Sequence, residues 1–118
     1  MLSIAHIVID CAHAQSLAGF WSAALTRPVD DGANPYFATI GRTQPDGAPV
    51  LMFLQVPEPK RVKNRLHVDL HGPNWRGEVD RLVGLGATKV SEHREYGTEW
   101  ITLTDPEGNE FDVGAGLD

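Results

Sequence analysis

The sequence predicts an α+β fold in which two βαβββ repeats form a curved mixed sheet around a cavity. Three observations support this prediction. The chain has 118 residues, of which 42% are hydrophobic and 22% charged, as is typical of a single globular domain with one core. Its two halves match when one is shifted along the other. Each half also shows the same order of strand and helix patterns.

The internal repeat depends on two matching segments. The shift that places His6 on His67 also places residues 43–47 on residues 104–108, and both of these segments combine Pro, an acidic residue and Gly. This combination is typical of tight turns. We therefore expect one domain made of repeat one (1–56), a linker (57–64) with two prolines and several charges, and repeat two (65–118).

In repeat one, β-branched residues predict a strand over 4–10, and apolar residues at helical spacing predict a helix over 14–25. Strands follow over 36–41 and 50–56, on either side of the Pro-Asp-Gly turn, and Val29 adds a short strand between helix and sheet. Repeat two has the same order. A strand over 65–71 precedes a helix over 75–85 that Gly86 caps, and strands follow over 88–92, 98–104 and 110–113.

Strand residues alternate between two faces, so each strand should present its apolar side to the helix. In the segment 65–71 the apolar and polar residues alternate without exception. For the segment 50–56 the same rule assigns Val50, Met52 and Leu54 to the helix side and Leu51, Phe53 and Gln55 to the opposite side. The surface away from the helices then mixes aromatic and polar side chains, which is typical of a small-molecule cavity.

Charge and cysteine content exclude several classes of protein. The net charge of −6 disfavours binding to nucleic acid or to anionic membranes, and the basic run over 60–65 is interpreted as a solvated connector. No apolar run is long enough to cross a bilayer. The single cysteine, Cys11, cannot form an internal disulfide, and no signal-peptide pattern opens the sequence, so we expect a cytoplasmic protein.

Two histidines occupy matching positions in the repeats. His6 and His67 both point to the side away from the helix, and Asp112 on the last strand shares that side. Two imidazoles and one carboxylate leave coordination positions open, which suits a catalytic divalent metal such as Zn, Ni, Mn or Fe. The alternative is structural, because nearby acids could simply hydrogen-bond both rings. His13 and His93 are expected in or near loops, exposed to solvent.

The sequence resembles the vicinal oxygen chelate superfamily, which includes glyoxalase I, bleomycin and fosfomycin resistance proteins and extradiol dioxygenases. The resemblance covers nearly the whole chain, through segments 6–11, 64–70 and 105–111. It implies the glyoxalase/bleomycin resistance/dioxygenase fold, with His6, His67 and Asp112 in three of the four metal-ligand places of glyoxalase I. Leu51, or Met52 if the turn is one residue longer, takes the fourth place, where glyoxalase I has glutamate.

The resemblance also implies roles for other residues. A bound metal would hold neighbouring oxygens of a substrate and stabilise the anion that forms. Glu110 is the candidate base. The expected substrate contacts are Phe37, Phe53, Gln55 and Trp100.

Two classes of function remain open. The first is a metal-dependent enzyme of the lyase, isomerase or dioxygenase type. The second is a non-catalytic protein that binds a small molecule or drug, as bleomycin resistance proteins do. The family usually pairs subunits, so we expect a homodimer, with His6 meeting His67 of the same chain or of its neighbour.

Overall fold

The computed structural model describes residues 1–116 and divides the chain into two compact units, Met1–Pro59 and Lys60–Asp118. The boundary lies inside the segment expected to be a linker. Both units combine one helix with one mixed sheet, so the α+β class is confirmed. Within the described residues, no helix has the length and apolar character needed to cross a membrane.

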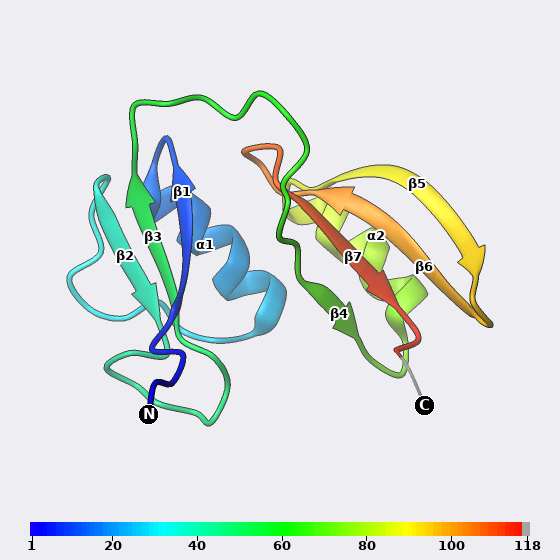
Figure 1. Ribbon diagram of the computed structural model, residues 1–118, viewed down its shortest axis with the longest axis horizontal. Helices are drawn as coiled ribbons and strands as arrows, with labels where there is room; N and C mark the ends of the chain where they lie inside the picture. Colours follow the sequence, from blue (N-terminus) through cyan, green and yellow to red (C-terminus); the bar gives the residue numbers. More distant parts are fainter. Residues whose placement is uncertain (117–118) are drawn as a thin grey trace. The chain divides into compact units, whose positions relative to one another are not determined.

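Unit 1 contains β1 (Ile7–Cys11), α1 (Ala14–Leu25), β2 (Phe37–Ile40) and β3 (Leu51–Gln55). The strand order is β1-β3-β2, with β1 parallel and β2 antiparallel to β3 (Figure 1). Val29 forms only an isolated bridge to Ile40, where the sequence predicts a short strand. The helix buries Leu17 and Trp21 in the core of this unit.

Unit 2 contains β4 (Asp69–His71), α2 (Trp75–Leu85), β5 (Thr88–Glu95), β6 (Thr98–Thr104) and β7 (Glu110–Gly114). Its strand order is β4-β7-β6-β5, with β4 parallel to β7 and the other pairs antiparallel. Gly86, at a φ of 122°, ends α2 and donates its N–H to the carbonyls of Leu82 and Val83, so the predicted cap is confirmed.

Both helices have the bounds that the sequence predicts, but three strand ends differ by more than one residue. Residues 4–6 and 65–68 precede their strands instead of belonging to them. Strand β5 continues to Glu95, beyond the expected end at residue 92, because the β5–β6 pairing extends as far as Thr98. The prediction that His93 lies in or near a loop is therefore wrong, since its backbone pairs with Trp100.

The predicted faces of β3 are also wrong. Leu51 and Phe53 pair with Ile7 and Ile9 of β1, and their side chains are buried at 7% and 0% exposure. Met52 and Leu54 lie on the other side and are half-buried. In the segment 50–56 apolar residues occur on both faces of the strand, so alternation could not show which face meets the helix. Packing against α1 decides it.

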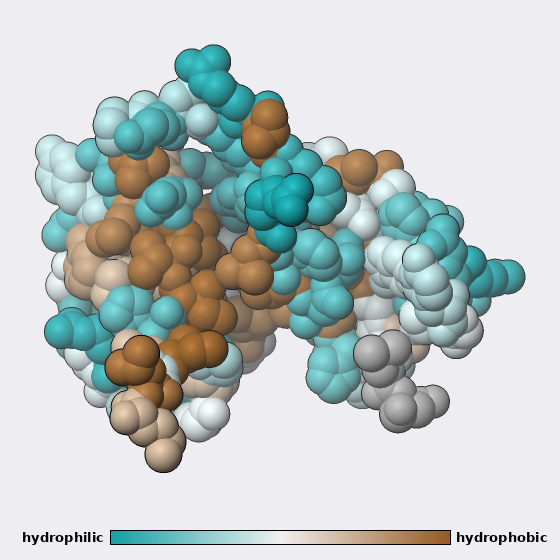
Figure 2. All heavy atoms as spheres, in the orientation of Figure 1, coloured by the Kyte–Doolittle hydropathy of each residue, from teal (hydrophilic) through white to brown (hydrophobic). Residues whose placement is uncertain are grey.

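Figure 2 shows apolar side chains gathered over the strands of unit 1. Val8, on β1, is 43% exposed on the side away from α1, and the preceding Ile4 is 86% exposed. The corresponding side of the unit 2 sheet carries polar residues instead, among them Asp69, Asp112 and Thr102, which occupy one row across three strands. Donor groups for a metal are therefore concentrated in unit 2.

Candidate metal centre

Three side chains of unit 2 bring ligand atoms together. The Nδ1 atom of His67 lies 3.1 Å from Oδ1 of Asp69 and 3.8 Å from Oδ2 of Asp112. One ligand atom from each of the three residues falls within 4.8 Å of the other two. His67 and Asp112 are thus brought together as the sequence predicts, and Asp69 joins them.

The strand register explains this cluster. Strand β4 is parallel to β7 and places Asp69 directly beside Asp112. His67 precedes Asp69 by two residues and so points to the same side. This segment still lies against β7, because the Asp112 N–H donates to the Val68 carbonyl at 3.1 Å. Neighbouring residues of adjacent strands have Cβ atoms about 5 Å apart, which is the spacing that ligands of one ion need.

Hydrogen bonding and exposure differ among the three residues. The hydroxyl of Thr102 donates to Oδ1 of Asp112 at 2.6 Å and leaves Oδ2 facing His67. The side chains of Asp112, His67 and Asp69 are 18%, 37% and 74% exposed, so the cluster runs from a partly enclosed carboxylate to an open one. A second oxygen held by a hydroxyl fixes the carboxylate orientation, as partners of metal ligands commonly do.

The donor set fits a divalent metal of the borderline class. One imidazole nitrogen and two carboxylate oxygens suit Mn, Fe(II), Ni or Zn and are poor ligands for soft ions such as Cu(I). Two carboxylates that share one face of a sheet favour a cation between them. The arrangement can hold an ion with open positions for substrate oxygens.

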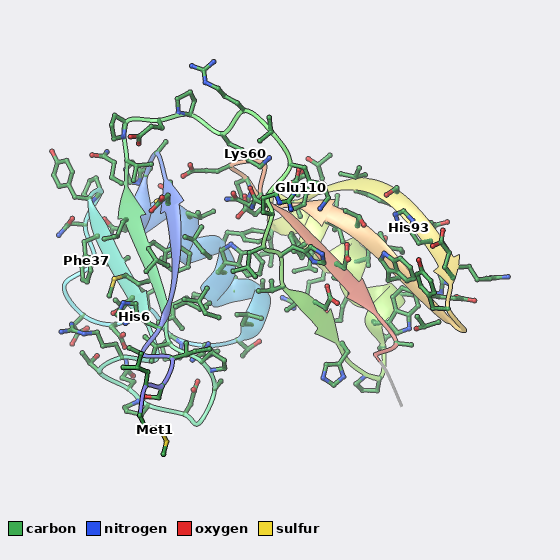
Figure 3. All side chains as sticks on the ribbon, in the orientation of Figure 1. Met1, His6, Phe37, Lys60, His93 and Glu110 are labelled. Atoms are coloured by element: carbon green, nitrogen blue, oxygen red, sulfur yellow. The ribbon has the colours of Figure 1, made fainter. Side chains whose placement is uncertain are left out.

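Unit 1 offers one donor at the matching places. His6 comes immediately before β1 and is exposed (Figure 3). The repeat makes Val8 the equivalent of Asp69, and Val8 pairs with Met52, so Met52 takes the place of Asp112. The structure thus selects Met52 over Leu51, because the loop 41–50 is longer than the loop 105–109. The approach of His6 to His67 stays a prediction.

Two of the four predicted substrate contacts lie on the side away from the helix. Phe37 is half-buried beside Leu54, at the edge of the unit 1 sheet (Figure 3). Trp100 is half-buried in β6, where it stacks on His93 at 5.0 Å between ring centroids and on Tyr96 at 6.5 Å. The Ser91 hydroxyl hydrogen-bonds the His93 ring, with 2.7 Å between Oγ and Nε2.

The other two residues lie on the opposite side from the one expected. Phe53 is fully buried toward α1, and Gln55 pairs with Cys11 on the same side. The Gln55 amide donates to the carbonyl of Ala12 at 3.0 Å. Their expected orientation toward a cavity is corrected by the β1–β3 register.

Glu110 is tied to the segment that precedes β4. Its carboxylate accepts the Asn64 N–H at 3.0 Å and lies 3.1 Å from the Lys60 ammonium, and Figure 3 shows the latter pair side by side. Burial acts to raise the pKa of Glu110, but these bonds outweigh it and hold the pKa below the ordinary 4.5. A stabilised carboxylate is a weaker base, so the catalytic role expected from the sequence stays a prediction with unfavourable electrostatics.

Sequence reasoning missed three residues of this surface as site residues. Asp69 had a visible signal, since it shares a face with His67 by simple alternation. Thr102 also falls on the side of Asp112 by alternation, but its hydrogen bond to Asp112 follows from the β6–β7 pairing. The position of His93 follows from the extra length of β5.

The profile of the Glyoxalase-like domain family matches residues 6–114, which is most of the chain. No curated protein matches. Among solved structures, a glyoxalase/bleomycin resistance protein/dioxygenase family enzyme from Burkholderia phytofirmans has a TM-score of 0.76 at 15% identity, with 96% of this chain and 98% of that chain covered.

Two further solved structures are similar. A fosfomycin resistance protein, FosX, from Listeria monocytogenes, complexed with Mn(II) and a dihydroxypropylphosphonic acid, has a TM-score of 0.76 at 11% identity over 99% of this chain and 92% of that one. A lactoylglutathione lyase from Agrobacterium tumefaciens has a TM-score of 0.68 at 15% identity over 97% and 93%. At these identities the similarity to solved structures shows only the fold. The match to the family profile shows the family. The chain therefore belongs to the family of glyoxalase-like domains.

Proposed function

We propose that this protein is a metal-dependent enzyme that acts on a small molecule with two neighbouring oxygens. The observation that carries the proposal is the cluster of His67, Asp69 and Asp112, with ligand atoms within 4.8 Å of one another. The Mn(II) complex of the Listeria fosfomycin resistance protein supports a divalent ion as the partner of such a site.

In this proposal His67 and Asp112 hold the ion, Asp69 adds a more exposed carboxylate, and His6 is a further ligand. The ion supplies Lewis-acid stabilisation of negative charge on substrate oxygens. Thr102 acts as a positioning residue, because its hydroxyl fixes the Asp112 carboxylate. Trp100 provides a flat apolar surface on the same side of the sheet for the remainder of the substrate.

A second candidate function is binding without catalysis, like that of bleomycin resistance proteins. Unit 1 favours it, since Val8 and Met52 stand at the places of Asp69 and Asp112 and leave that unit without a carboxylate there. Such a protein would hold its ligand by apolar contacts, and the exposed apolar side chains of unit 1 supply them (Figure 2).

Metal analysis separates the two functions. The protein is purified without a chelating tag, stripped with EDTA and titrated with Mn(II), Ni(II) and Zn(II) under calorimetry, and bound metal is counted by mass spectrometry. We expect about one ion per chain. His67→Ala and Asp112→Ala should each weaken binding roughly 10- to 100-fold, because each removes a direct ligand. His6→Ala tests the further ligand in the same way.

His71→Ala is the matched control, since His71 is an exposed histidine of β4 that lies outside the cluster. Equal metal affinity in His67→Ala and His71→Ala would contradict the proposed centre. A metal-free protein that binds aromatic probes with the same affinity before and after EDTA would support sequestration instead.

A further inference from the structure

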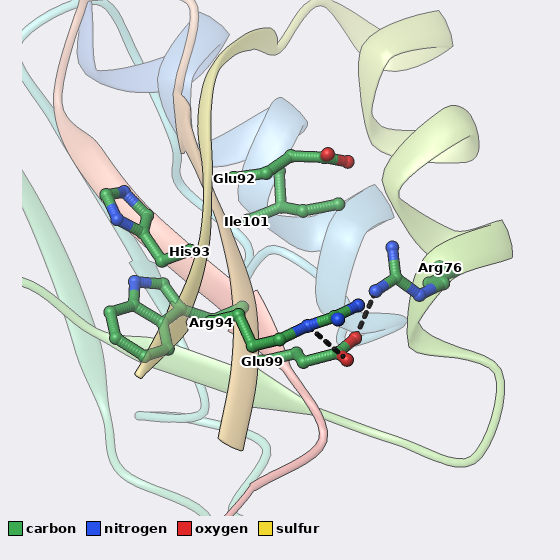
Figure 4. A pocket seen from close by; sticks show the side chains of 7 residues that line it. Arg76, Glu92, His93, Arg94, Glu99 and Ile101 are labelled. Atoms are coloured by element: carbon green, nitrogen blue, oxygen red, sulfur yellow. Dashed lines mark hydrogen bonds and ion pairs between the residues drawn. The ribbon is translucent and has the colours of Figure 1, made fainter. Parts of the chain in front are cut away.

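Unit 2 contains a cavity of about 350 Å³ between the start of α2 and the β5–β6 hairpin (Figure 4). Arg76 of α2 lines one side, and Glu92, Arg94 and Glu99 of the hairpin line the other. Ile101, which is 4% exposed, forms an apolar floor. The cavity thus combines two guanidinium groups with an apolar surface.

Most residues that line this cavity lie on the opposite side of the sheet from the candidate metal centre. Glu92 pairs with Ile101 and Arg94 with Glu99, and these rows face α2. Asp112 pairs with Thr102, which belongs to the alternate set of β6 positions. His93 and Trp100, which also line the cavity, lie on the same side as Thr102, but none of His67, Asp69 and Asp112 lines it.

Both guanidinium groups converge on one carboxylate. Arg76 and Arg94 each form an ion pair with Glu99, the latter with Nε 2.9 Å from Oε1 (Figure 4). Arg76 also stacks over the Trp75 ring, 4.4 Å from its centroid. A guanidinium held by an aromatic face and an acid is preorganised, and each group keeps several of its five N–H donors for another acceptor.

The charges of the lining residues balance, because Arg76 and Arg94 carry two positive charges and Glu92 and Glu99 two negative ones. Lys89 does not line the cavity but contacts Glu92 from outside it. Lys89 lies 3.0 Å from Glu92, and its hydrogen bond and field, with a smaller contribution from Arg76, lower the pKa of Glu92.

We propose that this cavity binds a small organic oxoanion, a carboxylate or a phosphonate, between Arg76 and Arg94, with the carbon part of the ligand against Ile101. Glu99 already accepts from some of the N–H donors of Arg76 and Arg94, so its carboxylate competes with the ligand for them. A purely structural ion-pair network would make no use of the spare donors, and removal of Glu99 would then only loosen the contact between α2 and the hairpin.

Binding is measured by NMR on EDTA-treated protein at low salt, with benzoate and methylphosphonate as separate probes. Trp75 lies beside Arg76, so its indole N–H signal should shift on titration, while that of Trp21, buried in unit 1, should not. We expect millimolar affinity that weakens with added salt, because both arginines are largely exposed. The two probes distinguish carboxylate from phosphonate preference.

Variants give the decisive outcomes. Arg76→Gln and Arg94→Gln should each weaken binding at least fivefold, whereas Glu99→Gln should strengthen it about threefold or more. Arg81→Gln is the matched control, since Arg81 is on α2 and pairs with Glu78 outside the cavity. Unchanged binding in both arginine variants, or no gain in Glu99→Gln, would overturn the proposal.

A His67→Ala, Asp112→Ala double variant keeps this test separate from the proposed metal function. It should lose metal and still bind the anion. If it loses the anion as well, the probe binds at the metal centre and the inference fails, whatever the outcome for metal binding.

Discussion

Phe53 is the largest side chain that is fully enclosed within unit 1. It pairs with Ile9 of β1 and Ala38 of β2, and all three lie on the side that α1 covers. Its environment is that of a core residue, where van der Waals contact on every side supports the packing.

At the residue scale we predict a large loss of stability in Phe53→Ala. The truncation removes a buried ring and leaves a cavity, which costs about 3–5 kcal/mol. Urea unfolding followed by circular dichroism measures the effect. Phe37→Ala is the matched control, because Phe37 is half-buried on the other side of the sheet and should cost much less. Equal losses in the two variants would contradict the orientation of β3.

Helix α1 begins with an uncommon cap. The His13 ring accepts the Ser16 N–H at 3.2 Å through Nδ1, and the first turn contains no acidic residue. The helix ends at Thr26, whose φ of 53° lies in the left-handed region and whose N–H binds the Ser22 carbonyl. The N-terminus, which is the positive end of the helix dipole, therefore has no acidic side chain in its first turn to compensate it.

At the element scale we predict that His13→Asp stabilises the protein. Aspartate is a preferred N-cap residue, and its charge interacts favourably with the helix N-terminus, so a gain of about 0.5–1 kcal/mol is expected. His13→Ala should cost a similar amount. Thermal unfolding measures both changes. Ala12→Asp adds the same charge one residue earlier, outside the cap position, and an equal gain there would show that the cap geometry plays no part.

At the scale of the whole molecule, an acidic chain with several stabilised carboxylates should be sensitive to acid. Burial acts to raise the pKa of Asp30, but hydrogen bonds from Thr39 and from the Arg42 N–H outweigh it and lower the pKa. The pKa of Glu110 is lowered as well, through Asn64 and Lys60. A carboxylate with a lowered folded-state pKa contributes stability that is present above its unfolded pKa and lost as the pH falls through the folded value.

We therefore predict that the free energy of unfolding falls as the pH is lowered from about 5 toward 3. Glu110→Gln should remove part of this dependence and cost about 1 kcal/mol at neutral pH, because it breaks a charge-assisted contact with the Asn64 N–H and Lys60. Urea titrations at a series of pH values test this. Glu58→Gln, an exposed glutamate of the linker, is the control, and a pH slope equal in both variants would argue against the role of Glu110.

Much of the architecture could be predicted because it depends on local patterns. The ranges of α1 and α2 and the cap at Gly86 follow from spacing and turn chemistry. The strand ends at residues 4–6, 65–68 and 93–95 could not be predicted in this way, since hydrogen-bond partners on other strands decide where pairing begins and ends.

The sequence by itself determined the composition of the donor set: His67 and Asp112 carry the right atoms, and alternation places Asp69 beside them. Tertiary structure alone decided which residues stand opposite one another. The parallel β4–β7 register joins Asp69 to Asp112, and the β1–β3 register puts Met52 in the equivalent place and turns Phe53 into the core. The physical reason is that a strand has a period of two, so a slip of one residue in a loop exchanges its faces without altering its local pattern.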